Sequence, residues 1–96
     1  MARFVMLHKF TDQGVTHIKD SPNRVAAFRQ AAAKVGVTVE AIYWLLGDYD
    51  GLVVLDAPDE AAATALALNL GARGSVRTHL CRAFDEAEFR AILAKT

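Results

Sequence analysis

The sequence has few of the residues that could link a chain covalently or hold a metal ion. Its single cysteine, Cys81, cannot form a disulfide within the chain. No group of Cys and His residues has the spacing of a zinc site. We therefore expect no metal site, no bound cofactor and a reducing, cytoplasmic location.

An excess of charge and long hydrophobic runs are also missing. Eleven Lys and Arg residues balance eleven Asp and Glu residues, so no net field attracts the chain to nucleic acid or to an anionic membrane. The apolar start of the chain is interrupted by His8 and Lys9, and no stretch approaches the roughly 18 apolar residues of a membrane span. The sequence thus argues against nucleic-acid and membrane partners.

Apolar material for one core is present. Hydrophobic residues make up 53% of the 96 positions, which predicts a single domain over residues 1–96. Alternating, β-branched and aromatic residues predict four strands, over 3–10, 38–46, 51–55 and 75–84. Residues spaced by three and four predict two helices, over 22–35 and 60–70, with a loop over 11–20 before the first and a short helix after residue 85.

The ends of these helices carry recognisable capping residues. Ser21 is expected to be the N-cap of the first helix, and Gly36 to take the left-handed conformation after its end. Asp59 is expected to cap the second helix, and the Asp-x-x-Glu pattern at 85–88 predicts a capping box. The hairpin turn has two possible placements, Gly47 to Asp50 or the pair Asp50-Gly51, of which we prefer the first.

The order of these elements is β-α-β-β-α-β followed by a helix. This order is typical of the ferredoxin-like fold, an α+β arrangement in which right-handed crossovers place both main helices on one face of a four-stranded antiparallel sheet. The other face should then be polar in a monomer.

Both faces of the predicted strands are apolar instead. In the first strand, Phe4 and Met6 alternate with Val5 and Leu7, so one apolar set remains without cover. Exposed side chains of this kind cost several kcal/mol at roughly 25 cal/mol per Å². We therefore predict a homodimer with the uncovered faces packed together, a dimeric α/β barrel, and leave higher homo-oligomers open. The alternative is that the C-terminal helix covers the face, but about 10 residues span only about 15 Å.

The segment Gly47-Asp48-Tyr49-Asp50 resembles the Gly-x-Tyr-Asp motif of the GYD domain family. Further segments follow in the order of that family, among them 10–14, 18–22, 56–59, 76–78 and 82–84. The resemblance covers essentially the whole chain and implies membership of the dimeric α/β barrel group. That group includes cofactor-free monooxygenases, muconolactone isomerases, haem-degrading enzymes and proteins without known activity, so the resemblance implies no particular reaction.

His8 is the histidine most suggestive of chemistry. Strand alternation places it with Phe4 and Met6, on the side expected to line the space between the two sheets, where it could be a general base or a ligand contact. The simpler interpretation is a hydrogen bond across the dimer. Tyr43 and Tyr49 could offer hydroxyls to a ligand. The candidate ligand-binding residues are thus Phe4, Met6, His8, Tyr43 and Tyr49.

Asp50 has two interpretations, a cap for loop amides or an acid or base. Together with His8 and Tyr49 it completes the set of catalytic candidates. Lys19 and Arg24 flank the start of the first helix and could hold an anion there, although solvated charges are the usual case. Trp44 is expected in the core beneath the helices.

Three functions are compatible with the sequence. The first is a homodimer that binds a small hydrophobic or aromatic molecule in an apolar cavity. The second is a cofactor-independent enzyme resembling a monooxygenase or isomerase, in which His8 or Tyr49 moves a proton. The third is a structural or regulatory assembly module whose interior is filled.

Overall fold

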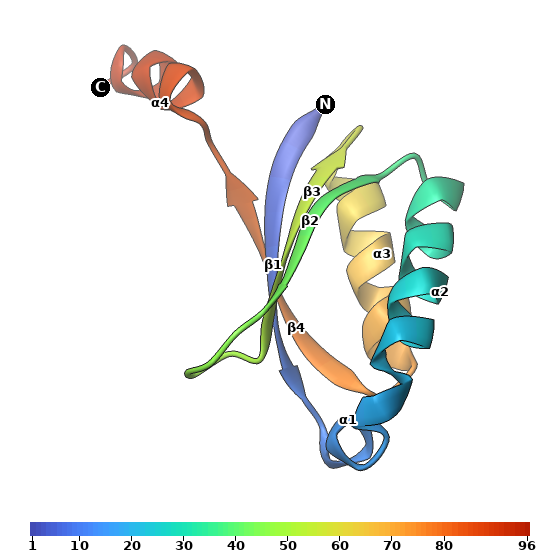
Figure 1. Ribbon diagram of the computed structural model, residues 1–96. Coiled ribbons are helices and arrows are strands. Elements are labelled where there is room, and N and C mark those ends of the chain that lie inside the picture. The colour runs from blue at the N-terminus through green and yellow to red at the C-terminus, as the bar shows by residue number, and fades with distance from the viewer.

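A computed structural model describes residues 1–96 as a four-stranded antiparallel sheet with two long helices on one face (Figure 1). The strands are β1 (Ala2–Phe10), β2 (Thr38–Trp44), β3 (Gly51–Ala57) and β4 (Val76–Ala83). They lie in the order β2-β3-β1-β4, and β1 pairs with both β3 and β4. The two long helices are α2 (Ser21–Lys34) and α3 (Glu60–Ala72). This arrangement confirms the ferredoxin-like α+β fold, and none of its helices has the length and apolar content needed to cross a bilayer.

The segment between β1 and α2 is more ordered than the predicted loop. It contains α1 (Asp12–Thr16) and a 3-10 turn, η1 (Ile18–Asp20). Thr11 begins α1, because its hydroxyl accepts from Gly14 N at 3.2 Å and donates to Gly74 O at 2.5 Å. These bonds tie the segment to the start of β4, a contact that local sequence patterns do not reveal.

Three of the four predicted helix ends are confirmed. Gly36 has a φ of 73°, Asp59 accepts from Ala62 N at 2.8 Å, and Asp85 and Glu88 form the capping box. The prediction for Ser21 is wrong. Because η1 runs directly into α2, Ser21 is already helical, and its hydroxyl donates to Ile18 O at 2.6 Å.

The cap of α3 gives a direct stability prediction. Asp59→Ala should lower the free energy of unfolding by about 1 kcal/mol, because one N–H group at the start of the helix loses its partner. Asp59→Ser should restore most of the loss, and Asp48→Ala, in the exposed hairpin loop, should change little. Urea denaturation measures all three, and an Asp59→Ala chain as stable as wild type would contradict this function of the cap.

The core lies between the sheet and the two long helices. Met6, Leu55 and Leu66 are its most fully buried large side chains, contributed by β1, β3 and α3. A bulge in β2 between Val39 and Ala41 interrupts the strict alternation of side chains between the two faces of the sheet. It places Val39 together with Ile42 on the helix side, where both pack against the core.

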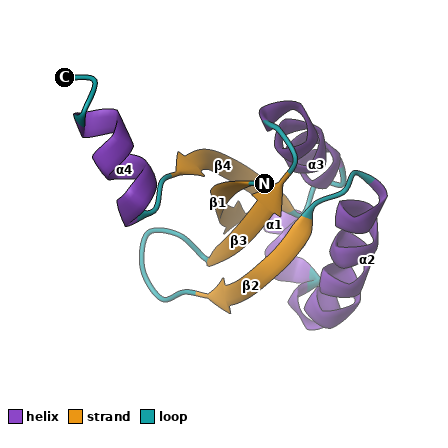
Figure 2. Ribbon diagram, turned by 90° about the horizontal axis from the view of Figure 1, so that it is seen from above, coloured by secondary structure: helices purple, strands orange, loops and turns teal.

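The opposite face of the sheet is left open. Its centre consists of half-buried aliphatic side chains from the two middle strands, namely Val5, Leu7, Leu52 and Val54. We call these four residues the open face. The C-terminal helix α4 (Glu86–Leu93) lies beyond the end of β4, away from α2 and α3 (Figure 2). It therefore does not cover the open face, so the alternative in which the C-terminal helix lies over this face is wrong.

Candidate functional site

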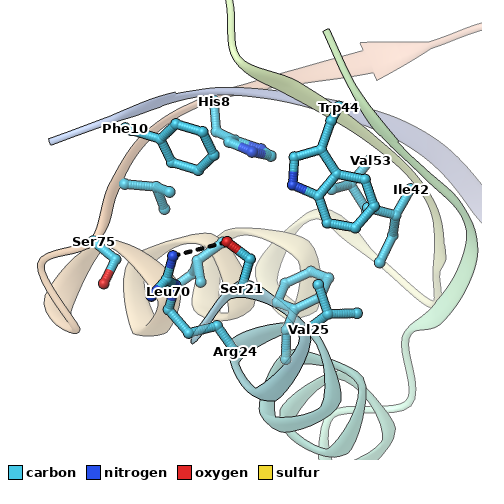
Figure 3. A pocket seen from close by; sticks show the side chains of 12 residues that line it. His8, Phe10, Ser21, Arg24, Val25, Ile42, Trp44, Val53, Leu70 and Ser75 are labelled. Carbon is cyan, nitrogen blue, oxygen red and sulfur yellow. Dashed lines mark hydrogen bonds between the residues drawn. The ribbon is translucent and has the colours of Figure 1, made fainter. Parts of the chain in front are cut away.

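A pocket lies between the sheet and α2, on the side opposite the open face (Figure 3). Its volume is about 70 Å³, and it opens to solvent on one side. Most of its walls are apolar, and four polar side chains interrupt them. The polar residues are His8, Ser21, Arg24 and Ser75; the apolar ones are Phe10, Val25, Phe28, Ile42, Trp44, Val53, Leu70 and Val76.

His8 lies on β1 in the middle of the pocket's sheet wall. Its register partners are Gly51 on β3 and Thr78 on β4. A Cβ atom at position 51 would lie only 2.1 Å from His8 Cε1 and 2.2 Å from Nε2. The imidazole therefore lies directly over the glycine backbone, and the ring needs this glycine to lie where it does.

The His8 ring is buried without full hydrogen bonding. The residue is only 8% exposed, and its Nδ1 atom has no hydrogen-bond partner. Burial lowers the pKa of His8 below its ordinary value of 6.5, and the charge of Asp50 opposes this effect. The imidazole is therefore neutral at neutral pH, and one of its polar atoms is buried without a protein partner.

Arg24 supplies the positive charge of the pocket from the first turn of α2. Its guanidinium donates to Ser21 Oγ at 3.0 Å (Figure 3) and to His17 O at 2.8 Å. None of the three ion pairs of the structure includes Arg24. The pocket thus carries a cation that is held in place by neutral oxygens and has no carboxylate beside it.

The lowered pKa of His8 predicts a pH-dependent stability. Below about pH 6.5 the imidazole of the unfolded chain takes up a proton, whereas the folded chain keeps its imidazole neutral to lower pH. The unfolded state then binds more protons, so the free energy of unfolding should fall as the pH drops from about 6.5 to about 5. Urea denaturation over this range should show a smaller fall for His8→Gln than for wild type, while the exposed His17→Gln retains the full fall. Equal slopes for wild type and His8→Gln would contradict the assignment.

The loop that joins β2 and β3 ends at Asp50, which connects this loop to β1. The Asp50 carboxylate accepts from Phe10 N at 2.8 Å, and Asp50 N donates to His8 O at 2.9 Å. Asp50 O also accepts from Leu45 N at 2.8 Å, which closes the loop over residues 45–50. The turn thus follows the preferred placement, and Asp50 acts in the structure as a cap of backbone amides.

Tyr49 extends to the other side of the sheet. Its ring meets His79 edge-on, with centroids 5.3 Å apart, and Lys9 Nζ lies 5.2 Å from its centroid. Lys9 and His79 share the face of the open-face residues, because they alternate with His8 and Thr78 along their strands. Two adjacent residues of one motif therefore fix the loop, Asp50 through the backbone of β1 and Tyr49 through ring contacts on the face opposite the helices.

The structure separates the five candidate ligand-binding residues. Only His8 lines the pocket. Phe4 and Met6 are buried in the core at 3% and 0% exposure, while Tyr43 and Tyr49 lie on the opposite side of the sheet. The expectation that His8 faces the space between two sheets is wrong. The crossovers place α2 and α3 over the face that carries His8, and no local pattern specifies which face they cover.

Several lining residues of the pocket could not be identified as such from the sequence. Phe10 is an exception, since its alternation with His8 along β1 indicates that both lie on one face; their ring centroids are 5.8 Å apart. No sequence pattern indicates that Ser75, just before β4, lines the pocket. Trp44 lies on the helix side as expected, but it is 55% exposed at the pocket instead of buried in the core.

A family model described as GYD domain matches residues 4–93. The chain is 35% identical over 94 residues to a protein of Thermus thermophilus named "Glutamine synthetase and cystathionine beta-lyase binding protein". This match covers 97% of the present chain and 99% of the relative.

Two solved structures have a similar fold. The crystal structure of the protein TTHA0845 from Thermus thermophilus matches with a TM-score of 0.57 and 22% identity, over 88% of this chain and 95% of that one. A homoserine dehydrogenase from Thiobacillus denitrificans matches with a TM-score of 0.57 and 15% identity. This second match covers 88% of the present chain but only 17% of the dehydrogenase. Both likenesses concern the fold alone.

Proposed function

This chain belongs to the GYD domain family, and from that premise we propose that it is a homodimeric binding module that attaches to other proteins. The observation that carries the proposal is the open face, which is apolar and has no cover within the subunit. The relative named as a binding protein supports the proposal, because its match spans nearly all of both chains.

The open face is expected to bind a second copy of the chain. Two segments project on the same side of the sheet as this face, the β2–β3 loop (residues 45–50) and α4, and we call them the arms (Figures 1 and 2). The radius of gyration is 14.3 Å, against about 12.5 Å expected for a compact chain of this length. The subunit is therefore more extended than a compact monomer of this length. Such a shape is expected when the β2–β3 loop and α4 pack against a second subunit.

Both arms carry apolar side chains with nothing packed over them. Leu46 at the loop is fully exposed, and Phe89 and Leu93 on α4 are 52% and 50% exposed. The helix is nevertheless well fixed at its start by the capping box and by an ion pair between Arg82 and Glu88 at 3.1 Å. A helix that is formed but uncovered is suited to contact another subunit, because little ordering entropy remains to be lost on binding.

The dimer is tested by placing a charge in the open face. Size-exclusion chromatography with light scattering should give twice the 10.4 kDa subunit mass for wild type. Val54→Asp should give the subunit mass, because a buried carboxylate without a partner opposes association. Leu68→Asp is the matched control, since Leu68 is 69% exposed on α3 and lies outside the open face. A monomeric wild type would overturn the dimer.

Attachment to other proteins is tested with the two enzyme classes in the relative's name. Wild type should co-elute with the glutamine synthetase or the cystathionine β-lyase of its own organism, whereas Val54→Asp should lose this binding together with the dimer. Absence of binding to both enzymes, with the dimer intact, would refute attachment to these partners and leave the dimer standing.

The enzymatic alternative has less support from the geometry. It requires His8 or Tyr49 to move a proton beside a bound substrate, and Tyr49 lies on the opposite side of the sheet from the pocket, which leaves His8 alone of the two. Asp50, the third catalytic candidate, is engaged by Phe10 N. The ionisable residues that line one pocket, His8 and Arg24, are suited to holding a molecule.

A further inference from the structure

We propose that the pocket beneath α2 binds a small aromatic hydroxy-carboxylate, a single-ring ligand whose carboxylate pairs with Arg24 and whose hydroxyl bonds the His8 imidazole. This site lies on the opposite side of the sheet from the open face, so the proposal goes beyond the binding of other proteins. Its failure would leave the proposed dimer and its attachment to enzymes unaffected.

The charge of the ligand follows from Arg24. A guanidinium has five N–H donors, and the protein engages this one through two neutral oxygens, His17 O and Ser21 Oγ. These bonds hold the group at the pocket while its charge has no counter-ion. A carboxylate is the complementary group, because it accepts charge-assisted hydrogen bonds from a guanidinium in a planar, bidentate geometry.

The second polar group of the ligand follows from His8. The ring lines the sheet side of the pocket (Figure 3), and its Nδ1 atom is buried without a partner. A neutral imidazole nitrogen can accept from a hydroxyl or donate to one, so either tautomer is satisfied by the same ligand group. A ligand hydroxyl would therefore give the His8 imidazole the hydrogen bond that no protein group supplies.

The apolar residues that line the rest of the pocket indicate the size and character of the ligand's apolar part. Val25 and Phe28 on α2 face Ile42, Trp44 and Val53 on the sheet across the pocket. A water-sized group needs about 10–15 Å³ by this measure, so the pocket of about 70 Å³ has room for roughly five to seven such groups. That is the size of the ring alone, so its carboxylate and hydroxyl lie at the border of this volume, and Trp44 offers the ring an aromatic surface.

Calorimetric titration with benzoate, 3-hydroxybenzoate, 4-hydroxybenzoate and benzamide tests each part of this assignment. We expect one hydroxybenzoate to bind wild type with a dissociation constant below about 1 mM, and benzamide at least about tenfold more weakly. Binding should also move the one indole N–H resonance in NMR spectra, because Trp44 is the single tryptophan of the chain. No binding of any of the three carboxylates up to about 10 mM would overturn the proposal.

Variants then separate the roles of the two polar residues. Arg24→Gln should abolish the preference for carboxylate over benzamide, while Arg24→Lys retains part of it, and the exposed Arg29→Gln on the same helix leaves it unchanged. His8→Leu should bind benzoate and the hydroxybenzoate equally. Unaltered preferences in folded Arg24→Gln, verified by circular dichroism, would overturn the carboxylate assignment, and an unaltered hydroxyl preference in His8→Leu would overturn the hydroxyl assignment.

Discussion

Gly51→Ala is expected to lower the free energy of unfolding by about 2–3 kcal/mol. The added methyl group would lie 2.1 Å from His8 Cε1 and 2.2 Å from Nε2, well inside contact distance. The imidazole cannot move away freely, because His8 is a buried residue in the strand between β3 and β4. Relief therefore requires displacement of the ring into the pocket or separation of β1 from β3.

The matched control is Gly71→Ala. Nothing lies within 4 Å of a Cβ atom at position 71, and the residue is part of α3. Alanine there should leave the stability unchanged or raise it by up to about 1 kcal/mol, because it is the better helix former. Urea denaturation compares the two substitutions, and an equal effect at both positions would show that contact with His8 is not the cause.

A double-mutant cycle assigns the effect to the His8 ring. In a His8→Ala background the space above residue 51 is empty, so Gly51→Ala should cost at least about 1 kcal/mol less than in wild type. Strictly additive losses would instead indicate that the backbone at Gly51, rather than the ring, rejects the side chain. The cycle also tests the position of His8 on which the proposed ligand site depends.

Leu55→Ala is expected to lower the free energy of unfolding by about 2–5 kcal/mol. Leu55 lies on β3 with 0% exposure, and it faces Phe4 across the β1–β3 pair. Its truncation leaves a cavity between the sheet and the helices that the surrounding strands cannot close. A loss of this size is a large fraction of the stability of a small domain.

Leu68→Ala provides the comparison within the same residue type. Leu68 is 69% exposed on α3, so its truncation should change the stability by less than about 0.5 kcal/mol. Thermal and urea denaturation of both variants measure the difference. Similar effects for Leu55→Ala and Leu68→Ala would contradict the placement of the core between the sheet and the long helices.

The elements and their ends could be predicted from the sequence because they depend on neighbouring residues. Gly36 takes the left-handed conformation that its position after a helical stripe indicates. Asp59 and Asp85 cap helices from the positions where an acidic residue precedes an apolar repeat. In each case the partner atom lies within a few residues of the signal.

The failures of prediction all involve contacts between distant segments. Ser21 is not a cap, because η1 runs directly into α2, in a segment that Thr11 also joins to Gly74 O. The bulge after Val39 places Val39 and Ile42 on the same face of the sheet, whereas strict alternation along β2 would place them on opposite faces. Neither the 3-10 turn before Ser21 nor the bulge in β2 produces a periodic pattern in the sequence, because each depends on the position of another strand or loop.

The sequence by itself determined the strands, the helices and the ferredoxin-like order, and it showed that more apolar surface exists than two helices can cover. Only the tertiary structure decided which surface stays open and which one forms the pocket. Alternation along a strand sorts side chains into two sets, but the helices that cover one set lie in the long connections between strands, residues 11–37 and 58–75. The same chain packing brought His8 and Arg24 to one pocket and left Tyr43 and Tyr49 on the other side of the sheet.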